Sequence, residues 1–158
     1  MDVIKAPDDY RNAPHPWIYL AGSIEMGKAE DWQTRVITLL EQRPGTLLNP
    51  RRDDWEKNWT QSADNPKFRE QVEWELKAQE DADLIFCYFS PGTYSPISLL
   101  ELGLFYSKMV VCCPKGFWRK GNVDIVCKRY KVPQVNSLKI FAEIYSNKHL
   151  KERRFPNL

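Results

Sequence analysis

The stretch SPGTYSPISLLELG, residues 90–103, decides the fold. The run before it, residues 83–89, is short, apolar and rich in aromatic side chains, which is typical of a central strand. Ser90-Pro91-Gly92 then ends the strand with turn residues. Ser95 followed by Pro96 predicts the start of a helix, because Ser is a frequent N-cap and Pro fits the first helical position. The stretch therefore predicts a strand, a turn and a helix in direct succession.

Glu101 is the acidic residue of this predicted helix. Its neighbours at helical spacing are mostly apolar: Ile97, Ser98, Leu104 and Phe105. We therefore expect the face that carries the carboxylate to be buried, close to the carboxyl end of the strand, where α/β sheets bind ligands. A buried carboxylate at that place could act as a nucleophile or a general base. The alternative is that Glu101 lies on a solvent-facing stripe.

Strand and helix patterns alternate along the rest of the chain. The expected strands are residues 17–22, 46–48, 83–89, 109–113 and 131–135, the last at an edge because it contains Pro133. The expected helices are residues 29–42, 68–82, the segment after Ser95, and 137–148. This alternation predicts a single domain over residues 1–158, built on a parallel sheet of roughly five strands with helices on both faces.

Composition narrows the classes of partner. The chain has 158 residues, 42% of them hydrophobic, and a formal net charge of +2, with basic residues scattered among acidic ones. This charge pattern argues against a nucleic acid polymer as partner. No apolar run approaches the roughly 20 residues that span a bilayer, and residues 1–16 lack the apolar segment of a signal peptide. We expect a cytoplasmic protein with no membrane partner.

The sequence indicates neither a metal nor an organic cofactor. The four cysteines form no Cys-x-x-Cys pair, which favours thiols in the core: Cys87, Cys112, Cys113 and Cys127. His15 and His149 lie in the polar ends, with no second ligand near them in sequence. The chain also lacks the glycine-rich and Walker motifs that bind NAD and ATP.

The loops after the first three predicted strands should surround one crevice together with Glu101, because the carboxyl ends of parallel strands meet at one edge. Gly22-Ser23 permits a close approach of the backbone to a ligand. Asn49 carries an amide that suits the edge of a nucleobase. The residue types therefore predict a small-molecule site.

Other residues near this crevice have two interpretations. Tyr19, inside the first strand, is either a core residue or aims its hydroxyl at the crevice. Arg51-Arg52-Asp53-Asp54 either contribute to the site or form a salt-bridged loop. Trp55 and Trp59 either stack on a base or cover the core.

Four segments, in this order, resemble the nucleoside 2-deoxyribosyltransferase family and its nucleotide N-glycosidase relatives: IYLAGS (18–23), LNPRR (48–52), ADLI (82–85) and LELG (100–103). The resemblance implies a flavodoxin- or Rossmann-like three-layer α/β/α sandwich. It also implies a pentosyl-transferring enzyme of nucleotide salvage that exchanges the base of 2′-deoxyribonucleosides, with deoxynucleosides and free nucleobases as its small-molecule partners and no cofactor.

The resemblance also assigns catalytic roles. Glu101 corresponds to the nucleophile that attacks C1′ of deoxyribose, and Tyr19 to the hydroxyl that positions its carboxylate. Glu75, eight positions before Asp83, stands where the family usually has an aspartate that protonates the leaving base. The chemistry agrees, since a carboxylate can trap an oxocarbenium-like sugar covalently while an acid assists departure of the base.

Ser95 bears on the substrate. Transferases of the family carry an acidic residue there for the 5′-hydroxyl of the sugar, whereas the nucleotide-cleaving relatives carry serine. Ser95 and the helix N-terminus could accept a phosphate, with Ser98 and Arg51 as helpers. Residues 49–52 and 116–124 look like the transferase branch, so we expect a deoxyribosyltransferase. The alternatives are a hydrolase of deoxynucleoside 5′-monophosphates and a non-catalytic nucleotide-binding sensor.

Residues 117–123 (FWRKGNV) predict a glycine-bearing loop with two exposed aromatic side chains, Phe117 and Trp118. Family resemblance suggests that neighbouring subunits complete each other's sites, with Asn122 as a substrate contact. We therefore expect a homo-oligomer, at least a dimer.

Overall fold

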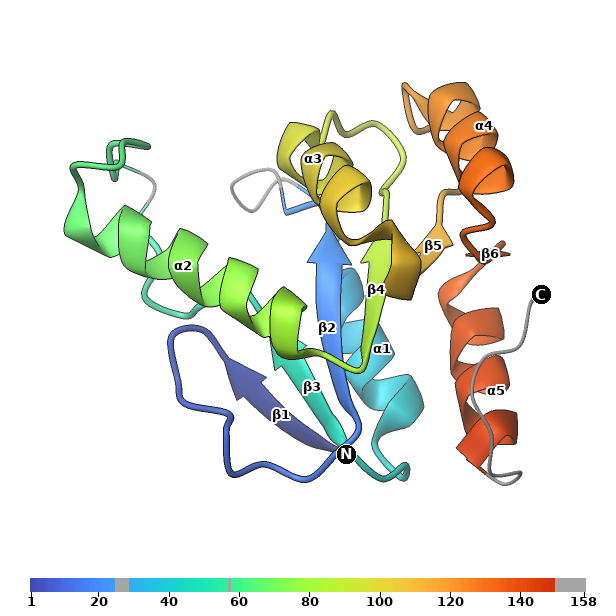
Figure 1. The fold of residues 1–158 in the computed structure, drawn as a ribbon, viewed down its shortest axis with the longest axis horizontal. Helices are drawn as coiled ribbons and strands as arrows, with labels where there is room; N and C mark the ends of the chain where they lie inside the picture. Colours follow the sequence, from blue (N-terminus) through green and yellow to red (C-terminus); the bar gives the residue numbers. More distant parts are fainter. Residues whose placement is uncertain (25–28, 57, 150–158) are drawn as a thin grey trace.

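A computed structural model describes residues 1–24, 29–56 and 58–149 and shows a six-stranded parallel sheet (Figure 1). The strands are β1 (Asp2–Lys5), β2 (Trp17–Gly22), β3 (Thr46–Asn49), β4 (Leu84–Tyr88), β5 (Met109–Cys112) and β6 (Gln134–Val135). Their order in the sheet is β1-β3-β2-β4-β5-β6, and every neighbouring pair is parallel. The chain leaves the centre of the sheet in one direction after β2 and in the other after β3, which creates a switch point beside β2.

Helices cover both faces of this sheet. They are α1 (Trp32–Leu40), α2 (Pro66–Asp81), α3 (Pro96–Phe105), α4 (Lys120–Tyr130) and α5 (Leu138–His149), with a 3₁₀ turn at Tyr106–Lys108. One core cluster joins the sheet to α2, α3 and α4, and a second joins it to α1 and α5. The predicted three-layer α/β/α sandwich is confirmed. No helix of the described residues is long and apolar enough to cross a membrane.

The central strands send alternate side chains to the two faces. In β2, Ile18 and Leu20 pack toward α1 and α5, whereas Tyr19 and Ala21 join the cluster under α2 and α3. Both sides are buried, as expected for a parallel sheet between two helical layers. The alternation places Tyr19 on the face that also carries Glu101.

Two elements were not predicted from the sequence. β1 is an edge strand whose side chains are at most partly buried. Its sequence, DVIK, has no continuous apolar run that would predict a buried strand. α4 begins at Lys120, inside the segment expected to be a loop, and buries only Val123 and Cys127. The exposure predicted for Phe117 is wrong, since its ring is buried and lies 4.8 Å from that of Phe89.

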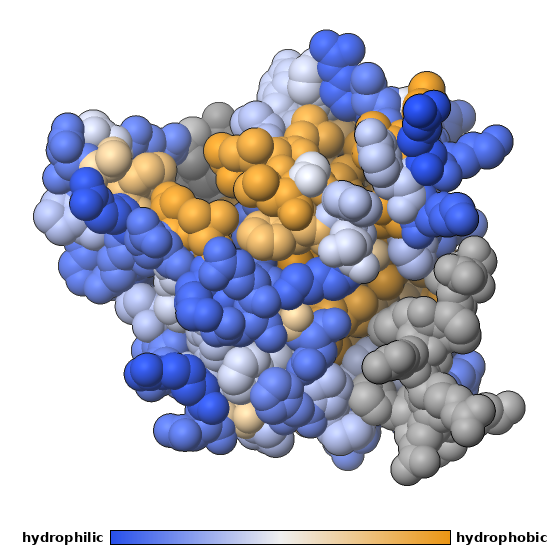
Figure 2. All heavy atoms as spheres, in the orientation of Figure 1, coloured by the Kyte–Doolittle hydropathy of each residue, from blue (hydrophilic) through white to orange (hydrophobic). Residues whose placement is uncertain are grey.

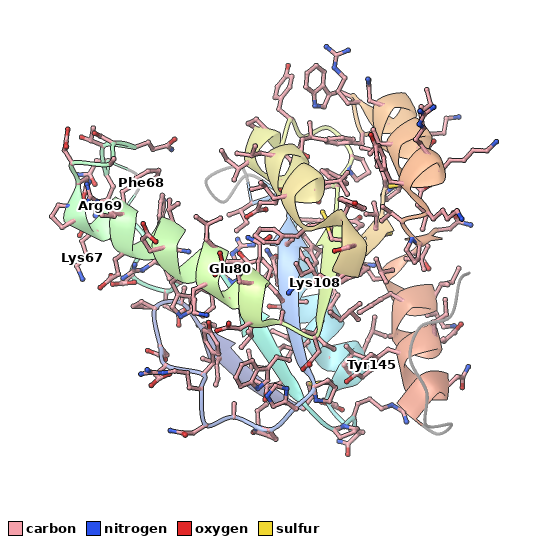
Figure 3. All side chains as sticks on the ribbon, in the orientation of Figure 1. Lys67, Phe68, Arg69, Glu80, Lys108 and Tyr145 are labelled. Atoms are coloured by element: carbon pink, nitrogen blue, oxygen red, sulfur yellow. The ribbon has the colours of Figure 1, made fainter. Side chains whose placement is uncertain are left out.

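α2 is fixed at both ends (Figure 3). At its start, the Asn65 side chain accepts hydrogen bonds from the backbone N–H groups of Lys67 and Phe68, which satisfies two donors of the first turn. At its end, Lys108 Nζ donates to the backbone carbonyl of Glu80 at 2.6 Å. A cation at this end also suits the helix dipole. Between these ends, Trp74 and Ala78 pack α2 against the core cluster.

Candidate active site

α3 turns its polar side inward. Glu101 is only 7% exposed, whereas Leu100, directly before it, is 60% exposed. Ile97 and Leu104, expected to help bury the carboxylate, also face solvent, so that part of the prediction is wrong. The apolar atoms over α3 are visible in Figure 2. Glu101 is buried because α3 packs its Ser98 side on the sheet.

The Glu101 carboxylate has one hydrogen-bond donor among the described side chains. Gln79 Nε2, on α2, donates to Glu101 Oε1 at 2.7 Å. Burial, together with the nearby charge of Glu75, raises the pKa of Glu101 to about 8, although the hydrogen bond from Gln79 acts in the opposite direction. Glu101 is thus a carboxyl that gains a proton far more readily than one in water.

Glu75 is the second carboxyl of the site. Part of the Glu75 residue is exposed on α2, but its carboxyl group is buried, and Oε1 accepts a hydrogen bond from Gln71 Nε2 at 2.7 Å. Burial raises its pKa to about 7. Because both carboxyl groups titrate near neutral pH, Glu75 and Glu101 together carry about one proton in that range. The higher pKa of Glu101 places this proton mainly on Glu101, and the form with Glu101 charged and the proton on Glu75 is the one that a nucleophile and an acid need.

Tyr19 lies beside both carboxyl groups. Burial raises its pKa well above the ordinary value, and the charges of Glu75 and Glu101 raise it further. Its hydroxyl therefore stays protonated at neutral pH and is available as a donor. Tyr19 is a core residue, since its side chain is fully buried. The charges of both carboxylates also act on its hydroxyl.

Three residues at the carboxyl ends of β2 and β4 form a hydroxyl cluster, which consists of Ser23, Thr93 and Ser95, and Ser90 bonds to it through its backbone N–H. Ser23 Oγ lies 2.8 Å from Thr93 Oγ1 and 2.6 Å from Ser95 Oγ, and it accepts the backbone N–H of Ser90 at 2.9 Å. Ser95 is the N-cap residue of α3, as predicted, but its φ of 45° is left-handed and its side chain makes no capping bond. Its hydroxyl joins the cluster instead.

A cavity of about 480 Å³ adjoins this cluster and is lined by Ala29, Glu30 and residues 90–94. Glu30 Oε1 accepts a hydrogen bond from the hydroxyl of Tyr88 at 2.7 Å, and its other oxygen accepts one from Arg35 at 2.9 Å. The cavity therefore has hydroxyl groups and one carboxylate in its walls. A groove of about 1050 Å³ at the amino ends of β4 and β5 is larger, and neither the cavity nor the groove has Glu75 or Glu101 among its lining residues.

Gly22 and Asn49 have structural reasons for their identity. A Cβ on Gly22, at φ 138°, would lie 2.2 Å from the carbonyl oxygen of Tyr88, so the neighbouring strand alone requires glycine there. Asn49 is buried, and its Oδ1 accepts the backbone N–H of Arg51 at 3.0 Å. Neither observation excludes a ligand contact by these residues.

The two arginines after β3 have different partners, and neither is placed as the phosphate helper that was predicted at Arg51. Arg51 Nη1 lies 3.5 Å from Gln33 Oε1 and 3.6 Å from Asp31 Oδ1, so it contacts the start of α1. No contact between Arg51 and Ser95 is found among the described residues. Arg52 is buried and pairs with Asp54, which confirms the salt-bridged loop.

Further predictions concern residues other than the two carboxyl residues and the hydroxyl cluster. Asn122 is exposed on α4 and does not join the site within one chain. The four cysteines are buried and free, as expected. The described residues contain no group of three metal-ligating side chains, and the side chain of His149 lies outside the described part of the chain. Trp55 and Trp59 pack on each other with their ring centroids 5.0 Å apart.

Gln71 and Gln79 are site residues that the sequence analysis missed. The glutamine side chain rarely takes part directly in a reaction, so the residue type did not indicate a site residue. The available signal was position, since Gln71, Glu75 and Gln79 are spaced four residues apart and so share one face of a helix.

A comparison with protein families gives one match. The family model described as "Nucleoside 2-deoxyribosyltransferase like" matches residues 15–117. No curated protein matches the chain. The matched range contains both buried carboxyl groups, Tyr19 and the hydroxyl cluster, whereas α4 with Asn122 follows it.

Proposed function

Since the chain belongs to the nucleoside 2-deoxyribosyltransferase-like family, we propose that it moves 2-deoxyribose between nucleobases through a covalent intermediate on Glu101. The observation that carries this proposal is the pair of buried carboxyl groups, Glu101 and Glu75, beside Tyr19 at the switch point of the sheet. The role we propose is nucleotide salvage in the cytoplasm.

The first step uses each carboxyl once. The ionised Glu101 attacks C1′ of the deoxyribose as the bond from C1′ to the base nitrogen breaks, and the electron pair of that bond leaves with the base. Glu75 gives its proton to the departing base. The sugar passes through an oxocarbenium-like state and ends as an ester on Glu101.

The second step reverses the first with a different base. A nitrogen of the incoming base attacks C1′, the ester bond to Glu101 breaks, and Glu75 takes the proton that the base loses. Two inversions at C1′ give net retention. Tyr19 positions the carboxylate in both steps, because its raised pKa keeps the hydroxyl protonated.

The walls of the cavity favour a nucleoside over a nucleotide. Glu30 places a carboxylate in the cavity beside the hydroxyl cluster; its pairing with Arg35 offsets part of its charge, and the remaining charge disfavours a 5′-phosphate. A 5′-hydroxyl can donate to a carboxylate or exchange bonds with Ser95. Arg51, the cation proposed as a phosphate helper, is already engaged with Asp31. We propose that Asn49, Gly22, Ser23 and Ser98 line the rest of the substrate site.

Hydrolysis of deoxynucleoside 5′-monophosphates is the second candidate. Ser95 at the N-terminus of α3, with Ser23 and Thr93 bonded to it, offers hydroxyl donors that a phosphate could recruit. In that reaction water, and not a base, resolves the intermediate. A non-catalytic sensor would be favoured by an exposed Glu101, and Glu101 is buried.

We also propose that the chain is a homo-oligomer. The outward face of α3 carries Ile97, Leu100 and Leu104, and Trp118 packs edge-on against Tyr94 next to it, so a large apolar surface faces solvent (Figure 2). A second copy would cover this surface and could bring Asn122 to a neighbouring site. Light scattering should give a mass well above the 18.6 kDa of one chain, and an active monomer would contradict this.

A product assay tests the activity. The protein is incubated with a deoxynucleoside or its 5′-monophosphate, with and without a second free base, and the products are separated by chromatography. We expect base exchange with the nucleoside. Free sugar phosphate from the monophosphate, at a rate that the second base does not change and that Ser95→Ala reduces, would establish the hydrolase instead.

A further inference from the structure

Each of the two buried carboxyl groups has its own amide donor from α2. Gln71 Nε2 donates to Glu75 Oε1 and Gln79 Nε2 donates to Glu101 Oε1, both at 2.7 Å. The three residues Gln71, Glu75 and Gln79 lie four apart on one face of the helix. α2 therefore presents an alternating row of amide, carboxyl and amide to the site.

Gln79 is held in one orientation at a cost. It is fully buried, its Nε2 also lies 3.3 Å from the backbone carbonyl of Glu75, and its Oε1 has no hydrogen-bond partner among the described residues. A buried acceptor without a partner is destabilising. Turning the amide over would point its oxygen at the Glu101 carboxylate and lose both bonds. The donor on Glu101 is thus retained although the amide oxygen stays unpaired.

We propose that Gln79 is a positioning residue, which holds Oε1 of Glu101 so that the other carboxylate oxygen is presented to C1′ of the sugar. This inference rests on the proposed function, because that function supplies the reaction. The hydrogen bond from Gln79 to Glu101 is independent of it. A carboxylate with one oxygen fixed keeps a single attack geometry, which is what pre-organisation of a nucleophile requires. An N–H donor also stabilises the ionised form against burial.

Few other groups titrate around Glu101. Tyr19 on β2 and Cys87 on β4 interact with its charge, and burial raises the pKa of both well above their ordinary values, so they stay neutral at neutral pH. Glu75 on α2 is the remaining ionisable neighbour. A change in the titration of Glu101 can therefore be assigned to Gln79 or Glu75.

The test compares Gln79→Met with Gln71→Met. Methionine keeps the length of glutamine and removes the donor. We expect Gln79→Met to lower kcat by roughly 10- to 100-fold with little change in KM, and to move the acidic limb of the kcat/KM pH profile up by about one unit. Gln71→Met removes the donor of Glu75, so its main effect on the kcat/KM pH profile should come through the titration of Glu75. A drop in melting temperature with an unmoved acidic limb would show a structural role only and overturn the inference.

A second readout does not depend on the reaction. In protein labelled with ¹³C at the glutamate carboxyl carbons, NMR follows the titration of Glu101 without substrate. We expect Glu101 to gain its proton at higher pH in Gln79→Met, and at still higher pH in the isosteric Gln79→Glu, which also serves if the methionine variant does not fold. An unchanged titration would contradict the inference. If the wild type transfers no deoxyribose, the proposed function fails, and this titration alone decides whether Gln79 acts on Glu101.

Discussion

Arg52 and Glu101 are the two charged side chains that are buried among the described residues, and their surroundings differ. Arg52 forms a two-point ion pair with Asp54 at 2.6 and 2.9 Å, reaches Glu70 at 3.3 Å, and lies over the ring of Trp59. Glu101 has one amide donor, and its nearest ionisable neighbour, Glu75, has the same sign of charge.

The pKa directions express this difference. The hydrogen bonds that Arg52 donates to Asp54 raise the pKa of Arg52, which fixes its positive charge. Burial raises the pKa of Glu101, which weakens its negative charge. A buried charge with opposite partners stabilises a loop, whereas a buried charge without them costs stability and is expected at a reacting site. We therefore assign a structural role to Arg52 and propose a chemical role for Glu101.

The largest effect should come from Glu101→Gln, which removes the charge that the fold does not compensate. We expect deoxyribosyl transfer to fall by roughly 10⁴-fold or more, because no nucleophile remains. The variant should also be more stable than the wild type at pH 8. Urea unfolding at pH 5 and pH 8 measures this, with the exposed Glu73→Gln on α2 as control.

The sign follows from the raised pKa. The folded chain keeps the Glu101 proton up to about pH 8, whereas the unfolded chain loses it near 4.5, so the stability of the wild type declines as pH rises through this window. Each unit of pKa elevation corresponds to about 1.4 kcal/mol, so the elevation from 4.5 to about 8 predicts a gain of about 4 kcal/mol at pH 8 and little at pH 5. Lower stability at pH 8 would mean that the ionised Glu101 is compensated as Arg52 is.

Glu75→Gln should have the next largest effect. The amide keeps the shape of the side chain and the contact with Gln71 but has no proton to give, so we expect a loss of about 10²-fold in transfer. The wild type should show a bell-shaped pH profile with apparent pKa values near 7 and 8 that belong to the pair. The variant should keep only a limb that rises with pH. A full bell in Glu75→Gln would assign the acid to another group.

Arg52→Met should have the smallest effect on activity and a clear effect on stability. Its partners Asp54 and Glu70 are exposed enough to regain water, so we expect a loss of about 1–3 kcal/mol in the free energy of unfolding. Activity per folded molecule should change by less than about threefold. Lys67→Met, which removes an exposed cation from the same Glu70, is the matched control and should change little. Equal effects of the two variants would remove the structural role of Arg52.

The buried strands β2 and β4 were predicted well from the sequence, because each is a short apolar run that is typical of a central strand. β1 and α4 escaped prediction for the opposite reason, since a polar edge strand and a helix that buries only Val123 and Cys127 leave weak patterns. β1 is stabilised by its pairing with β3, and α4 by its packing on the sheet, and neither contact can be read from the local sequence.

The site was predicted in part. The burial of Glu101 was expected from apolar neighbours, but the structure buries it with the polar side of α3 and exposes Ile97 and Leu104. That outcome depends on which face of α3 the sheet accepts, and periodicity alone does not decide it. The donor Gln79 comes from another helix, 22 positions away along the chain, so only tertiary packing brings it to Glu101.

The most direct test of the account is to find the sugar on Glu101. Wild-type protein is mixed with a deoxynucleoside in the absence of acceptor base, quenched with acid and digested, and the peptides are examined by tandem mass spectrometry. The account predicts a deoxyribosyl adduct on Glu101, absent in Glu101→Gln and lost when a second base is added before the quench. An adduct on Glu75 or another residue, or complete transfer without any adduct, would contradict it.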